Sequence, residues 1–168
     1  MNVEFINPFL EAVVNVLKTM AFTDPTPGIP FLKKKGEPSQ GDITGIVGMT
    51  GPVKGSLAVS FSESAILQVV STMFGEDFTE LNGDIQDAVG ELSNMISGDA
   101  RRMLAEKGYA FEASIPTVIT GKDHRISHTV AGPSLVMPFT LGEKHPFFVE
   151  ACFEDKREGT PTAARREH

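Results

Sequence analysis

The sequence has little of several residue types that mark particular classes of protein. Its 168 residues include no tryptophan, one tyrosine and one cysteine, Cys152. A single cysteine excludes an intrachain disulfide and fits a reducing compartment. No apolar run approaches the roughly 20 residues that a membrane-spanning helix requires. The first apolar segment is interrupted by Asn7-Pro8 and Glu11, unlike the core of a signal peptide. We therefore expect a cytoplasmic protein with no membrane partner.

Positive charge is also in short supply. The 15 lysines and arginines stand against 22 aspartates and glutamates, which gives a formal net charge of −7. This balance disfavours general binding to nucleic acid, so we expect no nucleic-acid partner. The length and a hydrophobic content of 40% suit one domain with a real core. We predict that domain over residues 1–154 and a disordered tail over 155–168, which lacks apolar periodicity.

Apolar residues recur at helical spacing in three segments. The predicted helices span residues 2–21, 63–74 and 81–108. Asn7-Pro8 is typical of a helix start, with Asn7 as the cap and Pro8 as the first helical residue. Ser62 is the predicted cap of the second helix, and Gly75 is its predicted end.

Alternating or β-rich segments predict the strands. They span residues 42–49, 53–61, 111–120, 134–141 and 146–154. Residues 23–41 are rich in proline and glycine and predict a loop with a short strand near Phe31-Leu32. We interpret Lys33-Lys34-Lys35 as part of that solvated loop. Helices grouped between hairpins indicate an α+β fold, with a mixed β-sheet and the helices packed on one face.

The predicted 81–108 helix has a distinctive polar face. Asp87, Glu91 and Asn94 fall within roughly 60° of one another around its axis. The opposite side is apolar and carries Ile85, Val89, Leu92, Ile96 and Met103. Gly90 and Gly98 border the polar face, although each weakens a helix by roughly 0.5–1 kcal/mol relative to alanine. We interpret both glycines as places where the backbone of another molecule comes close.

The spacing Asp87-x3-Glu91-x2-Asn94, followed by 21 residues and Pro116, resembles the signature of the CheC/CheX/FliY chemotaxis phosphatases. The first helix, the glycine-rich hairpin and the second helix occur in matching order. The resemblance covers roughly residues 1–154 and is closest to CheX, since the signature occurs once and no flagellar-switch domain follows. It implies a CheC/CheX-like fold.

The resemblance also implies a function. The chain would be a protein aspartyl-phosphate phosphatase, a hydrolase acting on a phosphorylated CheY-type response-regulator receiver in two-component signalling. The 81–108 helix would insert at the receiver active site, and a homodimer is the implied state. The receiver would supply Mg²⁺, and no cofactor or metal of the chain's own is implied.

Two residues are the implied catalytic groups. A carboxamide both donates and accepts hydrogen bonds, so Asn94 would orient the attacking water, as a glutamine does in GTPases. Glu91 would pair with the receiver's active-site lysine, and a role for Glu91 as a base stays open.

The remaining candidates are assigned to binding and structure. Asp87, Gly90, Gly98 and Arg101 are candidate partner-binding residues. Arg101 is better explained as an ordinary cation of the last turn, where the helix dipole favours positive charge. Pro116 is a structural candidate that would fix the strand beside the helix.

Other interpretations remain open or are rejected. The polar face could be ordinary solvated surface. A non-catalytic receiver-binding or scaffolding module, inside or outside chemotaxis, would carry the same fold. His124 and His128 are spaced four apart, but their segment is not helical and a third ligand is not placed, so we predict no zinc site. Asp87 and Glu91 lie on a convex helix, which argues against a glycosidase pair.

Overall fold

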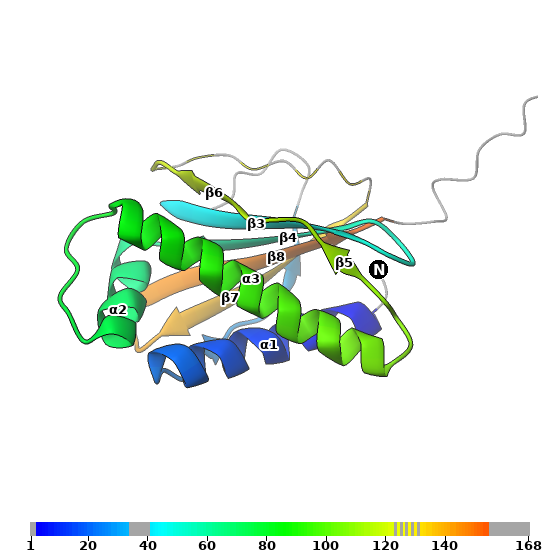
Figure 1. Cartoon of the computed structure of the whole chain (residues 1–168), viewed down its shortest axis with the longest axis horizontal. Coiled ribbons are helices and arrows are strands. Elements are labelled where there is room, and N and C mark those ends of the chain that lie inside the picture. Colours follow the sequence, from blue (N-terminus) through cyan, green and yellow to red (C-terminus); the bar gives the residue numbers. More distant parts are fainter. Residues whose placement is uncertain are drawn as a thin grey trace, which may run out of the picture.

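The computed structural model describes residues 3–33, 41–122, 124, 126, 128, 130 and 132–154. Its helices are α1 (Val3–Ala21), α2 (Glu63–Phe74) and α3 (Gly83–Glu106). Its strands are β1 (Thr26–Pro27), β2 (Phe31–Leu32), β3 (Ile43–Thr50), β4 (Gly55–Phe61), β5 (Glu112–Ala113), β6 (Thr117–Thr120), β7 (Ser134–Leu141) and β8 (His145–Phe153). Figure 1 shows the three helices over one face of the sheet, with α3 running diagonally across it.

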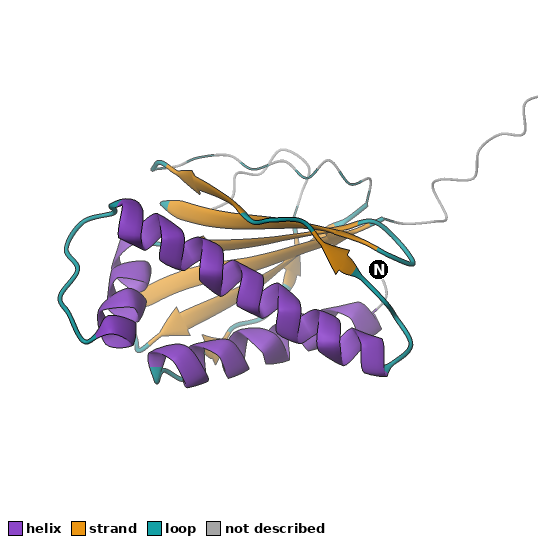
Figure 2. Cartoon of the chain, in the orientation of Figure 1, coloured by secondary structure: helices purple, strands orange, loops and turns teal. Residues whose placement is uncertain are grey.

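The strands form one sheet with the order β1-β7-β8-β4-β3-β5, in which β2 also pairs with β7 and β6 with β3. Every one of these pairings is antiparallel. The predicted α+β class is confirmed, and the sheet is antiparallel where a mixed sheet was predicted. Short hairpin turns join β3 to β4 and β7 to β8, and such turns can connect only antiparallel neighbours. Figure 2 shows the resulting two-layer arrangement.

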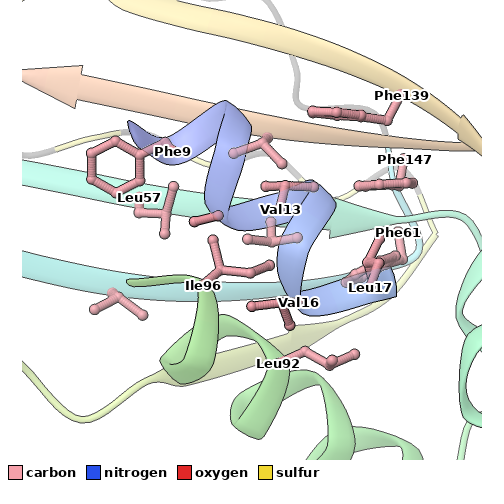
Figure 3. Packing of buried hydrophobic residues seen from close by; sticks show 14 of the residues in the cluster. Phe9, Val13, Val16, Leu17, Leu57, Phe61, Leu92, Ile96, Phe139 and Phe147 are labelled. Atoms are coloured by element: carbon pink, nitrogen blue, oxygen red, sulfur yellow. The ribbon is translucent and has the colours of Figure 1, made fainter. Parts of the chain in front are cut away.

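The core lies between the helices and the four long strands. Phe9 and Leu17 of α1 meet Leu57 of β4 and Ile96 of α3 in this layer, and all four are fully buried (Figure 3). At one end of the core the Phe147 ring stacks on Phe61 and on Phe139, with centroid distances of 5.2 and 5.1 Å. This packing ties α1 and α3 to the central strands.

The helix ends follow local capping rules. The Ser62 hydroxyl accepts a hydrogen bond from the Ala65 N–H at 3.2 Å, and Gly75 ends α2 with a φ of +66°, so both predictions for α2 are confirmed. The Asn82 carboxamide oxygen accepts from the Ile85 N–H at 3.1 Å and starts α3, two residues inside the predicted range.

The predicted helix over residues 2–21 is confirmed as α1, but the interpretation of Asn7 as its cap and Pro8 as its first residue is wrong, because the helix begins at Val3 and contains Pro8. Phe5 and Ile6 are buried in the core, and this burial extends the helix before the proline. A proline inside a helix lacks one main-chain donor, and the apolar contacts of the first turn offset that loss.

Two predicted segments differ in detail. Residues 111–120 form the short strands β5 and β6 on either side of 114–116, rather than one strand. Pro116 lies in the gap and has no N–H to donate to a ladder. The short strand at Phe31-Leu32 is confirmed as β2, whereas β1 was not predicted. The predicted tail at 155–168 lies outside the described residues.

The prediction that Lys33 is solvated is wrong. Its ammonium group donates to Glu150 of β8 at 3.2 Å, and the two side chains are only 10% and 6% exposed. His128 also bonds the same carboxylate, at 2.9 Å. Burial alone would raise the pKa of Glu150, but His128 and Lys33 lower it below its ordinary value. Lys34 and Lys35 lie outside the described residues.

His124 and His128 contact separate partners. The Nε2 atom of His124 is 2.7 Å from the Thr44 hydroxyl, while His128 bonds Glu150. Within the described residues, no group of three potential metal ligands is close enough to hold an ion. None of the described helices is long and apolar enough to cross a membrane.

Candidate functional site

The exposed face of α3 brings the predicted site residues together. Asp87, Glu91 and Asn94 are all exposed on this helix. The apolar positions on its other side are fully buried, as Leu92 and Ile96 illustrate. The structure therefore presents the three polar side chains on one convex surface, pointing away from the core.

A close contact with the sheet fixes the rotation of α3. Ser93 is fully buried, and its hydroxyl donates to the Val89 carbonyl at 2.7 Å. It packs on Gly45 of β3, where an added Cβ would lie 2.9 Å from the Ser93 Cβ. Glycine at 45 thus lets the helix approach the strand closely. Asn94 follows Ser93 about 100° further round the helix and is exposed to solvent.

One flank of this face is formed by the segment that joins β5 and β6. A Cβ added to Gly90 would lie 3.5 Å from Val118 of β6, so Gly90 lies beside that strand. Pro116 is half-buried in the same segment, and its neighbour Ile115 is 89% exposed. The flank therefore offers an apolar side chain to solvent beside the polar face.

The other flank is a groove of about 420 Å³ between α1 and α3. Val16, Met95 and Gly98 contribute to its lining. The Asn15 carboxamide donates to Asp99 at 3.3 Å and joins the two helices at its edge. The groove borders the polar face at Gly98, one turn after Asn94.

Among the described residues, no packing contact requires glycine at either position of the polar face. The nearest atom to a Cβ added at Gly98 is an Arg101 nitrogen 3.9 Å away, and Gly90 would meet Val118 at ordinary contact distance. Alanine would therefore fit at both positions and favour the helix. At Gly98, where only the flexible end of Arg101 is near, this is the pattern expected where another molecule approaches, whereas the Cα of Gly90 faces Val118 of the chain itself.

Two adjacent arginines near the end of α3 have different surroundings. Arg102 pairs with Asp99 at 2.8 Å and with Glu106 at 3.1 Å. The hydrogen bond with Asp99 is the main cause that raises the pKa of Arg102 above its ordinary value. Arg101 donates its Nε–H to the buried Ser97 hydroxyl at 3.3 Å. Its cationic group is thus held on the helix surface beside Gly98.

This arrangement suits recognition of a second protein more than binding of a small substrate. A carboxylate and a carboxamide lie one turn apart on a rigid helix, with no other described element folded over them. The carboxylate can pair with a cation, and the carboxamide can bind water through both its donor and its acceptor. The reacting group would have to be brought by the partner.

Several residues that shape this site were not found from the sequence. Ser93, Ser97 and Asn15 each act through a contact with a distant segment or an adjacent turn, whereas Ile115 is exposed to solvent on the flank. The only available signal was the small residue Gly45 in a β-rich segment, which suggests a close approach. It could not identify Ser93 as the neighbour.

Comparisons with known proteins identify a family that this chain matches. The family described as "Chemotaxis phosphatase CheX" matches residues 43–140. The CheY-P phosphatase CheX of Thermotoga maritima is 29% identical over 148 residues, which are 88% of this chain and 94% of that protein.

Solved structures of similar proteins support the same family. A CheC-like superfamily protein from Shewanella sp. PV-4 has a TM-score of 0.86 at 44% identity, covering 92% of this chain and 100% of that chain. CheX in a CheX–CheY–BeF3–Mg²⁺ complex from Borrelia burgdorferi has a TM-score of 0.77 at 27% identity, covering 90% and 98%. The chain belongs to the CheX family of chemotaxis phosphatases.

Proposed function

We propose that this chain is a phosphatase that accelerates hydrolysis of the aspartyl phosphate on a CheY-type response-regulator receiver. The observation that carries the proposal is the exposure of Glu91 and Asn94 together on one rigid helix. The family and its relatives support the choice of substrate, since one is named a CheY-P phosphatase and another was solved with CheY.

The proposed chemistry needs little from this chain. An acyl phosphate reacts when a water attacks in line and the charge on the phosphoryl oxygens is stabilised. Asn94 binds the attacking water and directs a lone pair to phosphorus without taking its proton. The bond between phosphorus and the aspartyl oxygen breaks, the receiver carboxylate is released, and the proton leaves with the inorganic phosphate. The position of Asn94 is fixed by Ser93, which is buried against Gly45. Such fixed positioning is itself a large source of catalysis.

Glu91 serves as the proposed alignment residue. Its carboxylate pairs with the active-site lysine of the receiver and sets the register of α3. Asp87 lies one turn earlier on the same face and adds negative charge toward that cation. Gly90 and Gly98 are proposed to admit the receiver backbone. Pro116 lies in the segment between β5 and β6, where it is proposed to shape one flank of the site.

Mg²⁺ enters this reaction as part of the substrate. The Borrelia complex contains Mg²⁺ together with CheY and BeF3. The proposed reaction accordingly uses the ion held by the receiver, where it neutralises charge on the phosphoryl group. Chelation of Mg²⁺ should abolish the acceleration, whereas unchanged acceleration in excess chelator would contradict this step. The proposed place of action is the cytoplasm.

We also propose a homodimer. Among the described residues, β7 pairs on its outer side only with the two-residue strands β1 and β2. Ile29, Phe31 and Leu32 are exposed apolar residues at this edge. A sheet edge with apolar neighbours favours pairing with a second chain. Light scattering over a concentration series should give twice the monomer mass, and a monomer at every concentration would contradict the proposal.

The direct test is the decay of a phosphorylated CheY-type receiver in Mg²⁺, with and without a substoichiometric amount of this protein. Each molecule should dephosphorylate many receivers, so decay should accelerate beyond one turnover. Binding without acceleration would instead favour a non-catalytic receiver-binding module. Phosphate release and loss of phosphorylated receiver should be followed together, because only hydrolysis changes both.

A further inference from the structure

Arg101 stands out because its charge is not offset inside the described part of the chain. Its only described hydrogen-bond partner is the neutral Ser97 hydroxyl, at 3.3 Å. The adjacent Arg102 contacts two carboxylates, Asp99 and Glu106. Two neighbouring residues of the same type therefore differ in one respect, the presence of an internal anionic partner.

The position of the Arg101 guanidinium is also defined. Side chains on a helix lean toward its N-terminus, and the bond to Ser97 holds Arg101 in that direction. A nitrogen of the guanidinium lies 3.9 Å from the place of a Cβ at Gly98. The cation therefore covers the turn that follows Asn94 and borders the proposed receiver contact.

Charge is distributed unevenly along the exposed face of α3. Asp84, Asp87 and Glu91 make its first half acidic. In its second half Arg102 pairs with Asp99 and Glu106, and Arg101 is the cation with no ion-pair partner among the described residues. Glu91 and Arg101 are ten residues apart, or about 15 Å along the helix axis. A partner that matches this face needs a cation near Glu91 and an anion near Arg101, and it can bind in only one direction.

We infer that Arg101 is a positioning residue that pairs with a carboxylate on the receiver surface, beside the phosphorylation site. This inference rests on the proposed phosphatase function. Asn94 and the guanidinium are separated by about one helical turn, so a carboxylate at the rim fits Arg101 better than the phosphoryl group that Asn94 addresses. The pair with Glu91 at one end and the pair with Arg101 at the other fix how α3 lies on the receiver.

The test compares Arg101→Ala with Arg102→Ala, a matched control that removes the same side chain one position later. KM and kcat are measured for decay of the phosphorylated receiver at low and at high salt. Arg101→Ala should raise KM about fivefold with kcat nearly unchanged, and it should reduce the salt dependence of KM. Arg101→Lys should return KM most of the way to the wild-type value, and the KM of Arg102→Ala should match that of the wild type within about twofold.

Each result decides the matter. Equal KM values for wild type and Arg101→Ala, or equal losses in Arg101→Ala and Arg102→Ala, would overturn the inference. A loss of kcat at constant KM would overturn it in favour of a phosphoryl contact. Binding of unphosphorylated receiver gives a second measure, since a rim carboxylate predicts the same fivefold loss there. If wild type itself fails to accelerate decay, the proposed function fails first and the inference with it.

Discussion

Replacing Gly98 with alanine should strengthen the fold and weaken the phosphatase. Gly98 lies inside α3, and a Cβ there would have only an Arg101 nitrogen nearby, at 3.9 Å. Alanine is favoured over glycine in a helix by about 0.5–1 kcal/mol. For a chain of this size that gain corresponds to a rise in Tm of roughly 1–4 °C. The added methyl group projects into the space where the receiver is proposed to approach.

Gly45→Ala is the matched comparison, because its Cβ would meet buried atoms. The Ser93 Cβ would lie 2.9 Å away and a Val89 methyl group 3.3 Å away. Overpacking of this kind costs about 1–3 kcal/mol. The same change from glycine to alanine should therefore have opposite signs at the two positions. Denaturant unfolding followed by circular dichroism measures both free energies of unfolding.

The functional half of the prediction is a rise in KM for Gly98→Ala of at least about fivefold, since one misplaced methyl group in a contact costs upward of 1 kcal/mol. A Gly98→Ala protein that is less stable than wild type would refute the packing argument. A stabilised protein with wild-type KM would refute the proposal that Gly98 faces the receiver.

Three further predictions concern the fold that supports the site. The pKa of Glu150 is lowered in the folded protein, so this carboxylate stabilises the fold above its ordinary value of 4.5, and that stabilisation is lost as pH falls through the lower folded value. Glu150→Gln should therefore weaken the loss of stability at acid pH, measured by denaturant titration over a pH series. An unchanged loss would count against the contacts of Glu150 with Lys33 and His128. Asn82→Ala removes the α3 cap and should cost about 1 kcal/mol with kcat unchanged; a stability equal to wild type would show that the cap is dispensable. Leu92→Ala empties a fully buried position and should cost about 2–5 kcal/mol in thermal and denaturant unfolding; a cost below 1 kcal/mol would mean that the core under α3 can collapse.

Local patterns in the sequence were sufficient for much of the fold. The caps at Ser62 and Gly75 depend on residues within one turn, and both were predicted. The first helix shows the limit of such rules. Asn7-Pro8 has the local form of a helix start, but burial of Phe5 and Ile6 against distant strands extends α1 past it. Long-range packing overrode the local preference there.

In the candidate site, too, local patterns predicted some residues, and contacts between distant segments determine others. Helical periodicity was enough to place Asp87, Glu91 and Asn94 on one exposed face. The contact of Ser93 with Gly45 joins residues 48 positions apart, and no local pattern specifies it. Lys33 was misassigned for the same reason, since its partner Glu150 lies on a strand far along the chain. Pairings between distant segments arise from the assembled sheet, which sequence patterns do not specify.

The most direct test of the central claim is the decay of a phosphorylated CheY-type receiver in the presence of wild type and of Asn94→Ala, with receiver binding measured for both. The account predicts that substoichiometric wild type accelerates decay, and that Asn94→Ala binds the receiver but no longer accelerates it. Full acceleration by a correctly folded Asn94→Ala protein would contradict the account.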